Sequence, residues 1–479
     1  MPGRLSFLIS CLVLCGCSKN TPEGSAEVAE VSAPDTIPFE ERANLARTAP
    51  PPERKTREEF FAEIYIPAYE KVGLKDAKWD KEARAYLSLL STNAGHGISD
   101  PDKVRELRDA VDKTGCEDPL VRYMILRQRY DAHVANSTVT NLWVQAAEGL
   151  EKSDYHPYWK FFARYRAALA MRAVVRETKT KTQSQEIQEM FNQCYQRSMA
   201  LLQDHSLPTE VMYQIVDEYY LSDIKRKDYA KWVIENIEPL MVSGWGDTAP
   251  VWYAIGEFHI AHAWNERGTG WSDSVSQDGW KAMAEHLHAA RVALEKSWSI
   301  KPLEKAGVAM LTVELGDSKN RQAMETWFNR VMWMNPASYD ACERKMYWLQ
   351  PKWHGSVAEM IGFGRECLTN TAWRGNVPLI LYQSHRLLAT WYEQSKQGKM
   401  QDYWLLPNVW PDVKASFERY FEVNPLNTGW RHDYAKAAYD CRAWEDLRLQ
   451  IPLLGQINYE FFGGKEAYEK MLLDAEKNR

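Results

Sequence analysis

The sequence lacks the short motifs that would assign a reaction to it. Its 479 residues contain no H-E-x-x-H metalloprotease motif, no G-x-S-x-G nucleophile elbow and no phosphate-binding glycine loop. None of the eight cysteines belongs to a C-x-x-C pair, which argues against zinc ribbons and thioredoxin-type sites. We therefore expect no catalytic residues, no cofactor and no metal. An α/α-type lyase or hydrolase with an unrecognised helical site is the remaining enzymatic alternative.

An excess of basic residues is also missing. The formal net charge is -6 and the pI is near 6.1, whereas nucleic-acid binding needs a basic surface that neutralises phosphates. Long apolar runs are absent except for Leu5 to Leu14, which is about half of the roughly 20 residues that span a bilayer. The sequence thus argues against a nucleic-acid partner and against a transmembrane helix.

The start of the chain has the layout of an export signal. Arg4 precedes the apolar run, and Leu14-Cys15-Gly16-Cys17 follows it. This segment resembles a bacterial lipobox, and the resemblance implies cleavage before Cys17 and acylation of its thiol. Ser18, in place of an aspartate, slightly favours the outer membrane. An ordinary secretory signal, with Cys17 as a small residue near the cut, is the alternative.

The segment between the signal and the first helix has the composition of a tether. Residues 17–56 contain Pro22, Pro34, Pro38 and the run Pro50-Pro51-Pro52, with few large apolar side chains. Such a composition cannot bury enough apolar surface to fold alone. We expect a signal peptide over residues 1–16, and a lipidated cysteine with a disordered linker over residues 17–56.

Beyond the linker, the hydrophobic pattern is helical. Apolar residues recur at spacings of three and four, as in Tyr229, Trp232, Val233 and Ile237, and alternating strand-like runs are nearly absent. Asp100-Pro101 and Asp118-Pro119 each place an N-cap acid before a proline suited to the first helical turn. The pattern predicts an all-α chain.

Residues 250–455 resemble tetratricopeptide repeats. Pro302 and Pro336 are 34 residues apart, which is the period of that family. Positions that match its packing pattern are Trp252, Gly256, Ala290, Pro302, Phe328, Pro336, Phe417 and Pro425. The resemblance implies an irregular α-solenoid of helix hairpins, because one hairpin cannot bury its apolar face without neighbours.

The repeat resemblance divides the chain unevenly. Residues 241–479 form the expected repeat region, and its C-terminal part is similar to uncharacterised bacterial tetratricopeptide-like domains. Residues 57–240 show no matched signature, so they are either degenerate repeats continuous with the later array, which we favour, or a separate bundle.

Five cysteines remain after Cys11, Cys15 and Cys17. An odd number leaves at least one free thiol, and free cysteines often serve as small buried hydrophobes. Cys342 and Cys367 are the pair best placed for a disulfide, since both fall in neighbouring expected helices of an oxidising compartment.

Histidines and tryptophans are the remaining candidates for a site. His259, His262, His286 and His288 lie on two expected helices, but their spacing is not that of a zinc site, so packing or surface roles are favoured. Most of the 20 tryptophans are expected in the core. Those expected in loops are the candidate binding residues: Trp245, Trp271, Trp280, Trp404 and Trp410. Exposed aromatic side chains can stack on sugars or clamp a peptide.

Together these features indicate a tethered binding protein. We expect a helical-repeat scaffold that is anchored to a bacterial membrane through Cys17, faces the periplasm or cell exterior, and binds a protein or peptide partner. The alternative is an envelope protein that binds or processes glycans with its loop aromatics. The sequence leaves the partner and the oligomeric state open.

Overall fold

The structure is a computed structural model that describes residues 53–93, 100–178, 184–226, 228–270, 272–317 and 320–478. Every regular element within these ranges is a helix, so the predicted all-α class is confirmed. The expected signal peptide, Cys17 and nearly all of the linker lie outside the described residues. None of the helices in the described ranges combines the length and the apolar character needed to cross a membrane.

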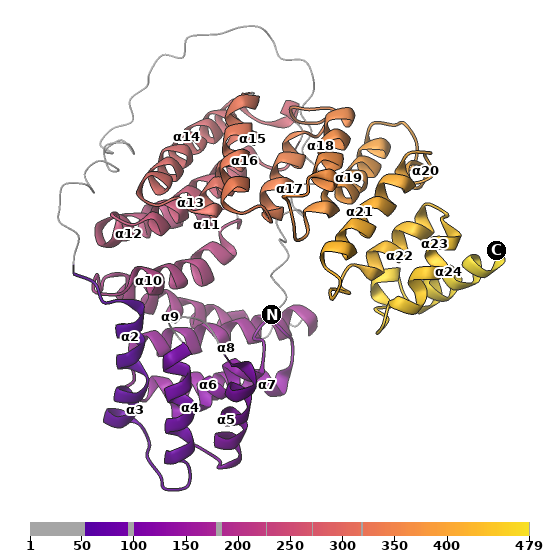
Figure 1. Cartoon of the computed structure of the whole chain (residues 1–479). Helices are drawn as coiled ribbons and strands as arrows, with labels where there is room; N and C mark the ends of the chain where they lie inside the picture. The colour runs from indigo at the N-terminus through magenta and orange to yellow at the C-terminus, as the bar shows by residue number, and fades with distance from the viewer. Residues whose placement is uncertain are drawn as a thin grey trace, which may run out of the picture. The chain divides into compact units, whose positions relative to one another are not determined.

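The described part of the chain divides into two compact units, residues 53–261 and residues 262–478, and the division falls within helix α13 (Ala249–Arg267). Figure 1 shows the helices of the first unit in indigo and magenta. They are α2 (Arg57–Ile64), α3 (Ile66–Val72), α4 (Asp80–Asn93), α5 (Pro101–Lys113), α6 (Pro119–Arg129), α7 (Ser137–Glu151), α8 (Pro157–Thr178), α9 (Ser184–Leu202), α10 (Thr209–Ile215), α11 (Tyr229–Asn236) and α12 (Glu238–Trp245).

The predicted helix starts of this unit are confirmed. Asp118 accepts hydrogen bonds from the backbone N–H groups of Leu120 and Val121, and Asp100 accepts one from that of Lys103. Each bond satisfies an N–H that the helix leaves without a partner, and the following proline has no N–H to satisfy. These two aspartates therefore fix where α6 and α5 begin.

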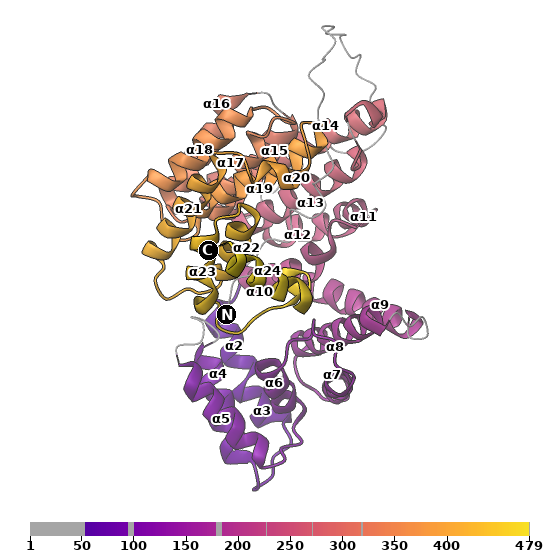
Figure 2. The ribbon, with the colours of Figure 1, turned by 90° about the vertical axis from the view of Figure 1, so that its right-hand side faces the viewer.

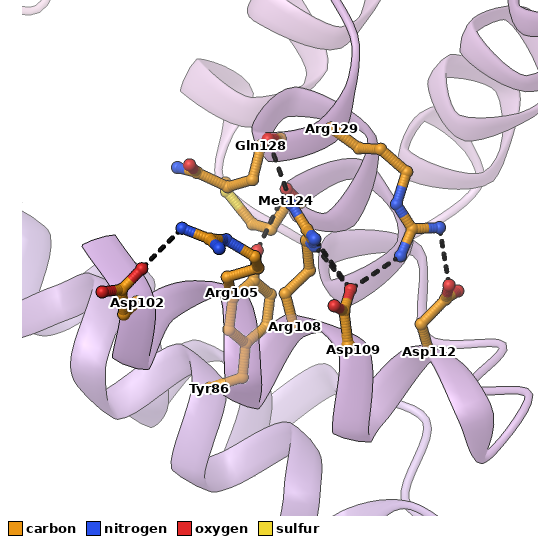
Figure 3. Close-up of polar contacts among 9 residues, drawn as sticks. All are labelled: Tyr86, Asp102, Arg105, Arg108, Asp109, Asp112, Met124, Gln128 and Arg129. Atoms are coloured by element: carbon orange, nitrogen blue, oxygen red, sulfur yellow. Dashed lines mark hydrogen bonds and ion pairs between the residues drawn. The ribbon is translucent and has the colours of Figure 1, made fainter. Parts of the chain in front are cut away.

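Paired charges join α5 to α6. Asp109 accepts hydrogen bonds from Arg108 and from Arg129, and Arg129 also donates to Asp112 at 2.6 Å (Figure 3). The carboxylates of Asp109 and Asp112 are more than 40% exposed, and exposed pairs contribute about 0–1 kcal/mol each. These ion pairs therefore fix how α5 and α6 are aligned more than they stabilise the fold. Nothing in this network points to a ligand.

The second unit contains α14 (Gln277–Ile300), α15 (Glu304–Asp317), α16 (Arg321–Met334), α17 (Tyr339–Trp348), α18 (Val357–Thr369), α19 (Ile380–Gln394), α20 (Met400–Tyr403), α21 (Val409–Val423), α22 (Arg431–Asp440), α23 (Trp444–Gln450) and α24 (Lys465–Lys477). Figure 2 shows these helices in colours that run from rose at α14 through orange to yellow at α24. Consecutive long helices pack against each other, as α14 does on α15 and α15 on α16. Alternate helices also meet, since α15 contacts α17 and α17 contacts α19.

The repeat-packing positions have the expected environments. Trp252, Ala290, Phe328 and Phe417 are each at most 1% exposed. Three prolines follow helix ends two residues later: Pro302 after α14, Pro336 after α16 and Pro425 after α21. A proline cannot donate the N–H that another helical turn would need. It therefore stops each helix at the point where the next hairpin begins.

The buried cysteines are free thiols. Cys342 and Cys367 are neighbours, and burial together with a hydrogen bond from Cys342 raises the pKa of Cys367 well above its ordinary value. The expected adjacency is present, but the disulfide is not formed. The Cys342 Sγ instead lies 3.7 Å from the Met332 sulfur, as a small apolar side chain would.

Candidate functional site

The most distinctive surface feature of the second unit is a hollow between the ends of α14 and α16. Its volume is about 680 Å³, within the range of pockets that accept a ligand side chain or a small molecule. We call it the α14–α16 groove. Its lining residues are Trp298, Pro302, Thr326, Asn329, Arg330, Trp333 and Met334.

The sequence of α16 explains why this face is open. Met324, Phe328 and Val331 form its buried stripe, and each is at most 1% exposed. Thr326, Asn329, Arg330 and Trp333 recur at spacings of three and four on another face of the helix and are exposed. Trp333 is 86% exposed, although large aromatic side chains are usually mostly buried. The helix therefore presents one face to the core and a second, partly aromatic face to the surroundings.

The lining residues Trp298 and Arg330 both contact the buried Trp327. The rings of Trp298 and Trp327 meet edge to face, with centroids 5.3 Å apart, a geometry worth about 0.5–1.5 kcal/mol beyond its burial. The guanidinium carbon of Arg330 lies 4.4 Å from the centre of the Trp327 ring, within the range of a cation–π contact. Arg330 is thereby held at the groove while its charge remains exposed.

A glycine on α15 allows these parts to come together. A Cβ at Gly307 would lie 2.4 Å from the Val331 Cγ2 atom and 3.2 Å from the Trp298 ring. Only a residue without a side chain permits this approach of α15 to both neighbours. Asn335, which follows α16, donates hydrogen bonds of 2.9 and 3.0 Å to the Glu304 carboxylate at the start of α15. The groove is thus built on fixed helices.

The only charged side chain in the lining of the groove is Arg330. Lys301 is exposed next to the lining residue Pro302, and in the described ranges neither it nor Arg330 forms an ion pair. The apolar surface extends to Ile300 and Met334, which are 41% and 38% exposed. The groove therefore offers apolar contact area, the Arg330 cation, the Thr326 hydroxyl and the Asn329 amide, with Lys301 at its border.

The predicted binding tryptophans do not form one site. Trp245 is the last residue of α12, is fully buried, and donates its Nε1 hydrogen to the Leu207 carbonyl at 3.0 Å. It belongs to the core of the first unit, so its assignment to a binding loop is wrong. Trp271 lies outside the described residues.

The other three predicted tryptophans are in or beside helices. Trp280 occupies the first turn of α14, is 36% exposed, and lies 5.3 Å from the Arg267 guanidinium. Trp410 lies in α21 and donates to Asp446 at 3.0 Å, and half-buried Trp404 directly follows α20. Trp280 and Trp410 lie in helices, so their expected placement in loops is wrong, whereas Trp404 lies in the turn after α20, as expected. Trp280 keeps enough exposed surface to contact a partner.

The histidines take separate environments. His259 lies 3.2 Å from Glu238 in the first unit, whereas the rings of His262 and His286 pack 4.1 Å apart in the second. Among the described residues, no cluster of three or more His, Cys, Asp or Glu side chains is arranged to hold a metal ion.

Sequence reasoning missed the two tryptophans that define the groove. Trp298 and Trp333 lie near the ends of α14 and α16, and neither is among the candidate binding residues predicted from the sequence. The signal that could have found Trp333 is its helical phase, since it lies off the Met324, Phe328 and Val331 stripe. An aromatic residue off the packing stripe must face away from the core.

A second hollow, of about 490 Å³, lies between α7, α8 and α9 and is lined mainly by charged and amide side chains. Arg164, one of its lining residues, is 3.8 Å from Glu151, so part of its charge is already compensated.

Comparison of the chain with protein-family models, curated proteins and solved structures finds no match.

Proposed function

We propose that this chain is a helical-repeat scaffold that is tethered to a bacterial membrane and binds a protein or peptide partner in the cell envelope. The observation that carries the proposal is the α14–α16 groove with its 86% exposed Trp333. Partner sites are enriched in tryptophan, which offers a large contact area, and in arginine, whose planar guanidinium can form several hydrogen bonds at once. Trp298, Trp333 and Arg330 supply this combination.

The order of helix packing supports an α-solenoid of tetratricopeptide-like hairpins. In the second unit each long helix meets the next one, and α15, α17 and α19 meet in succession. In such arrays each repeat contacts only its neighbours, which creates an extended surface for a partner. The prolines after α14, α16 and α21 support the same arrangement.

The tether belongs to the proposal through the sequence of residues 1–56. Acylation of Cys17 would attach the chain to the membrane, with the outer membrane slightly favoured, because buried acyl methylenes contribute about 0.8 kcal/mol each. The helical part would then face the periplasm or the cell exterior. In this arrangement the chain keeps its partner near the membrane and needs no catalytic residues.

Crosslinking in living cells tests the proposal. A photo-crosslinking amino acid at Thr326, inside the groove, should capture a discrete protein, and adding Trp333→Ser should reduce that capture severalfold. The matched control carries the crosslinker at Leu426, which is 96% exposed and outside the groove lining. Equal capture from both positions, or no effect of Trp333→Ser, would refute the groove as the partner site.

A glycan-binding role is the second candidate, because the exposed Trp333 ring lies among the polar side chains of Thr326, Asn329 and Arg330. An aromatic face flanked by hydrogen-bonding groups can stack on a sugar ring. Pulldown with cell-wall fragments separates the two roles. Retention of the chain by glycan fragments, lost on Trp333→Ser and without a crosslinked protein, would favour the second candidate.

A further inference from the structure

The only charged side chain in the lining of the α14–α16 groove is a cation. Arg330 lines the groove and Lys301 borders it, and neither has an acidic partner among the residues that the structure describes. Glu295 on α14 and Glu304 on α15 lie near the groove in the sequence, but neither belongs to its lining. Glu304 accepts two hydrogen bonds from Asn335, and Glu325 forms an ion pair of 2.6 Å with Lys345.

The cations Arg330 and Lys301 favour a ligand that carries negative charge. Unpaired cations beside an apolar surface attract carboxylates and repel amines, which gives specificity more than raw affinity. An arginine fork can also bind a carboxylate through two parallel hydrogen bonds. The occupant should therefore combine an apolar group for Trp298 and Trp333 with negative charge for Arg330 and Lys301.

The polar residues of α16 indicate the backbone form of that ligand. Thr326 and Asn329 stand on the same exposed face as Arg330 and Trp333. In the described residues the Asn329 amide forms no hydrogen bond, so its donor and acceptor are both available. An extended peptide leaves its own N–H and C=O groups free to meet such side chains, whereas a helical ligand does not.

A membrane surface fits these features less well. Peripheral membrane patches place apolar side chains at a protruding face, with cations around them. Here the apolar surface lines a hollow of about 680 Å³, and Thr326 and Asn329 lie within it. A concave site with internal hydrogen-bonding groups is suited to a chain that enters it.

We infer that the α14–α16 groove binds an extended peptide segment in which an aromatic residue or a proline is followed directly by carboxylates. The apolar residue packs between Trp298 and Trp333, and the carboxylates meet Arg330 and Lys301. This inference rests on the proposed function and adds the chemical class of the partner. It also predicts that binding weakens as salt is raised, because the attracting charges are exposed.

Fluorescence anisotropy with defined peptides tests the inference. The protein is the full chain with Cys17→Ser, which prevents acylation, and the probe is a labelled Gly-Ser-Pro-Phe-Glu-Glu-Ser-Gly peptide. Two matched probes replace both glutamates with lysine, or the phenylalanine with alanine. The first probe should bind at least about tenfold more tightly than the lysine probe, because it gains two exposed ion pairs of up to about 1 kcal/mol each. It should bind about fivefold more tightly than the alanine probe, because it gains one aromatic contact of about 1 kcal/mol.

Charge reversal provides the decisive variant. Arg330→Glu should weaken the acidic probe about tenfold and strengthen the lysine probe, whereas Leu426→Ala should change neither. Circular dichroism checks that the variants keep their helices. Equal affinity for acidic and basic probes, or an unchanged preference in Arg330→Glu, would overturn the inference.

The peptide assay and the crosslinking in cells together separate this inference from the proposed function. If Trp333→Ser abolishes crosslinking in cells but the acidic probe does not bind, the scaffold function stands and the assignment of ligand chemistry falls. Binding to vesicles of anionic phospholipid that competes with the probe and is lost on Trp333→Ser would also overturn it in favour of a membrane contact.

Discussion

A buried glutamate without a partner makes the stability of the second unit depend on pH. Glu343 lies in α17, is 6% exposed, and among the described residues forms neither a hydrogen bond nor an ion pair. Burial raises its pKa from 4.5 to about 7; the charge of nearby Asp340 also raises it, and Arg344 opposes both. A charged carboxylate in this position has lost water without gaining a compensating contact.

The direction of the pH dependence follows from the pKa of Glu343, which is 4.5 in the unfolded chain and about 7 in the folded chain. Between pH 4.5 and about 7 the folded chain holds a proton on Glu343 that the unfolded chain has released, so stability falls as the pH rises through this window. At 1.36 kcal/mol per pKa unit, the cost of charging this group in the folded state reaches about 3 kcal/mol above pH 7. Asp433, whose pKa is raised to about 6 mainly by burial, contributes in the same direction.

Glu343→Gln should therefore stabilise the chain by about 2–3 kcal/mol at pH 8 and change it by less than about 1 kcal/mol at pH 5. Glutamine keeps the shape of the side chain and removes the charge. Urea unfolding at both pH values, followed by tryptophan fluorescence, measures the free energy of unfolding of the two proteins. Because Asp433 is present in both, its contribution cancels in the comparison. The matched control is Glu366→Gln at an exposed position in α18, which should show no such pH dependence. An effect of Glu343→Gln that is equal at pH 5 and pH 8 would refute the reasoning.

Two further outcomes follow from the structure, and a third, at Cys17, follows from the sequence. Gly307→Ala should lower stability by about 1–3 kcal/mol through overpacking against Val331. Gly362→Ala, with nothing within 4 Å of the added Cβ, should raise it by about 0.5–1 kcal/mol; both are measured by urea unfolding, and equal effects would contradict the packing argument. Tyr403→Phe removes a 2.8 Å hydrogen bond to buried His385 and should cost about 1 kcal/mol, seen as faster hydrogen exchange in α20; unchanged exchange would count against this bond. Cys17→Ser should release the chain from the membrane fraction, and retention of the variant there would contradict the lipid anchor.

The sequence predicted those features of the fold that depend on local chemistry. Helix starts at Asp100 and Asp118, and helix ends before Pro302, Pro336 and Pro425, follow from groups that a helix cannot satisfy internally. Helix capping and helix termination by proline depend only on residues that are close in the sequence. They can therefore be predicted from a single sequence. The buried stripe of α16 was predictable for the same reason.

The site was harder to predict because exposure depends on tertiary neighbours. Trp245 has the polar surroundings of a loop residue in the sequence, yet α12 carries it into the core, where the Leu207 carbonyl accepts its hydrogen bond. Trp333 is not among the candidate binding residues predicted from the sequence, yet it is 86% exposed. Residue type and local composition do not separate these two cases. Helical phase does separate Trp333 from the buried residues of α16.

The position of the groove bears on how a scaffold of this kind would use its partner. In tetratricopeptide arrays the concave surface presents side chains of the first helices, whereas α14 and α16 correspond to second helices in the expected repeat pattern. A groove between second helices would therefore leave the first-helix surface of such an array available for a second contact.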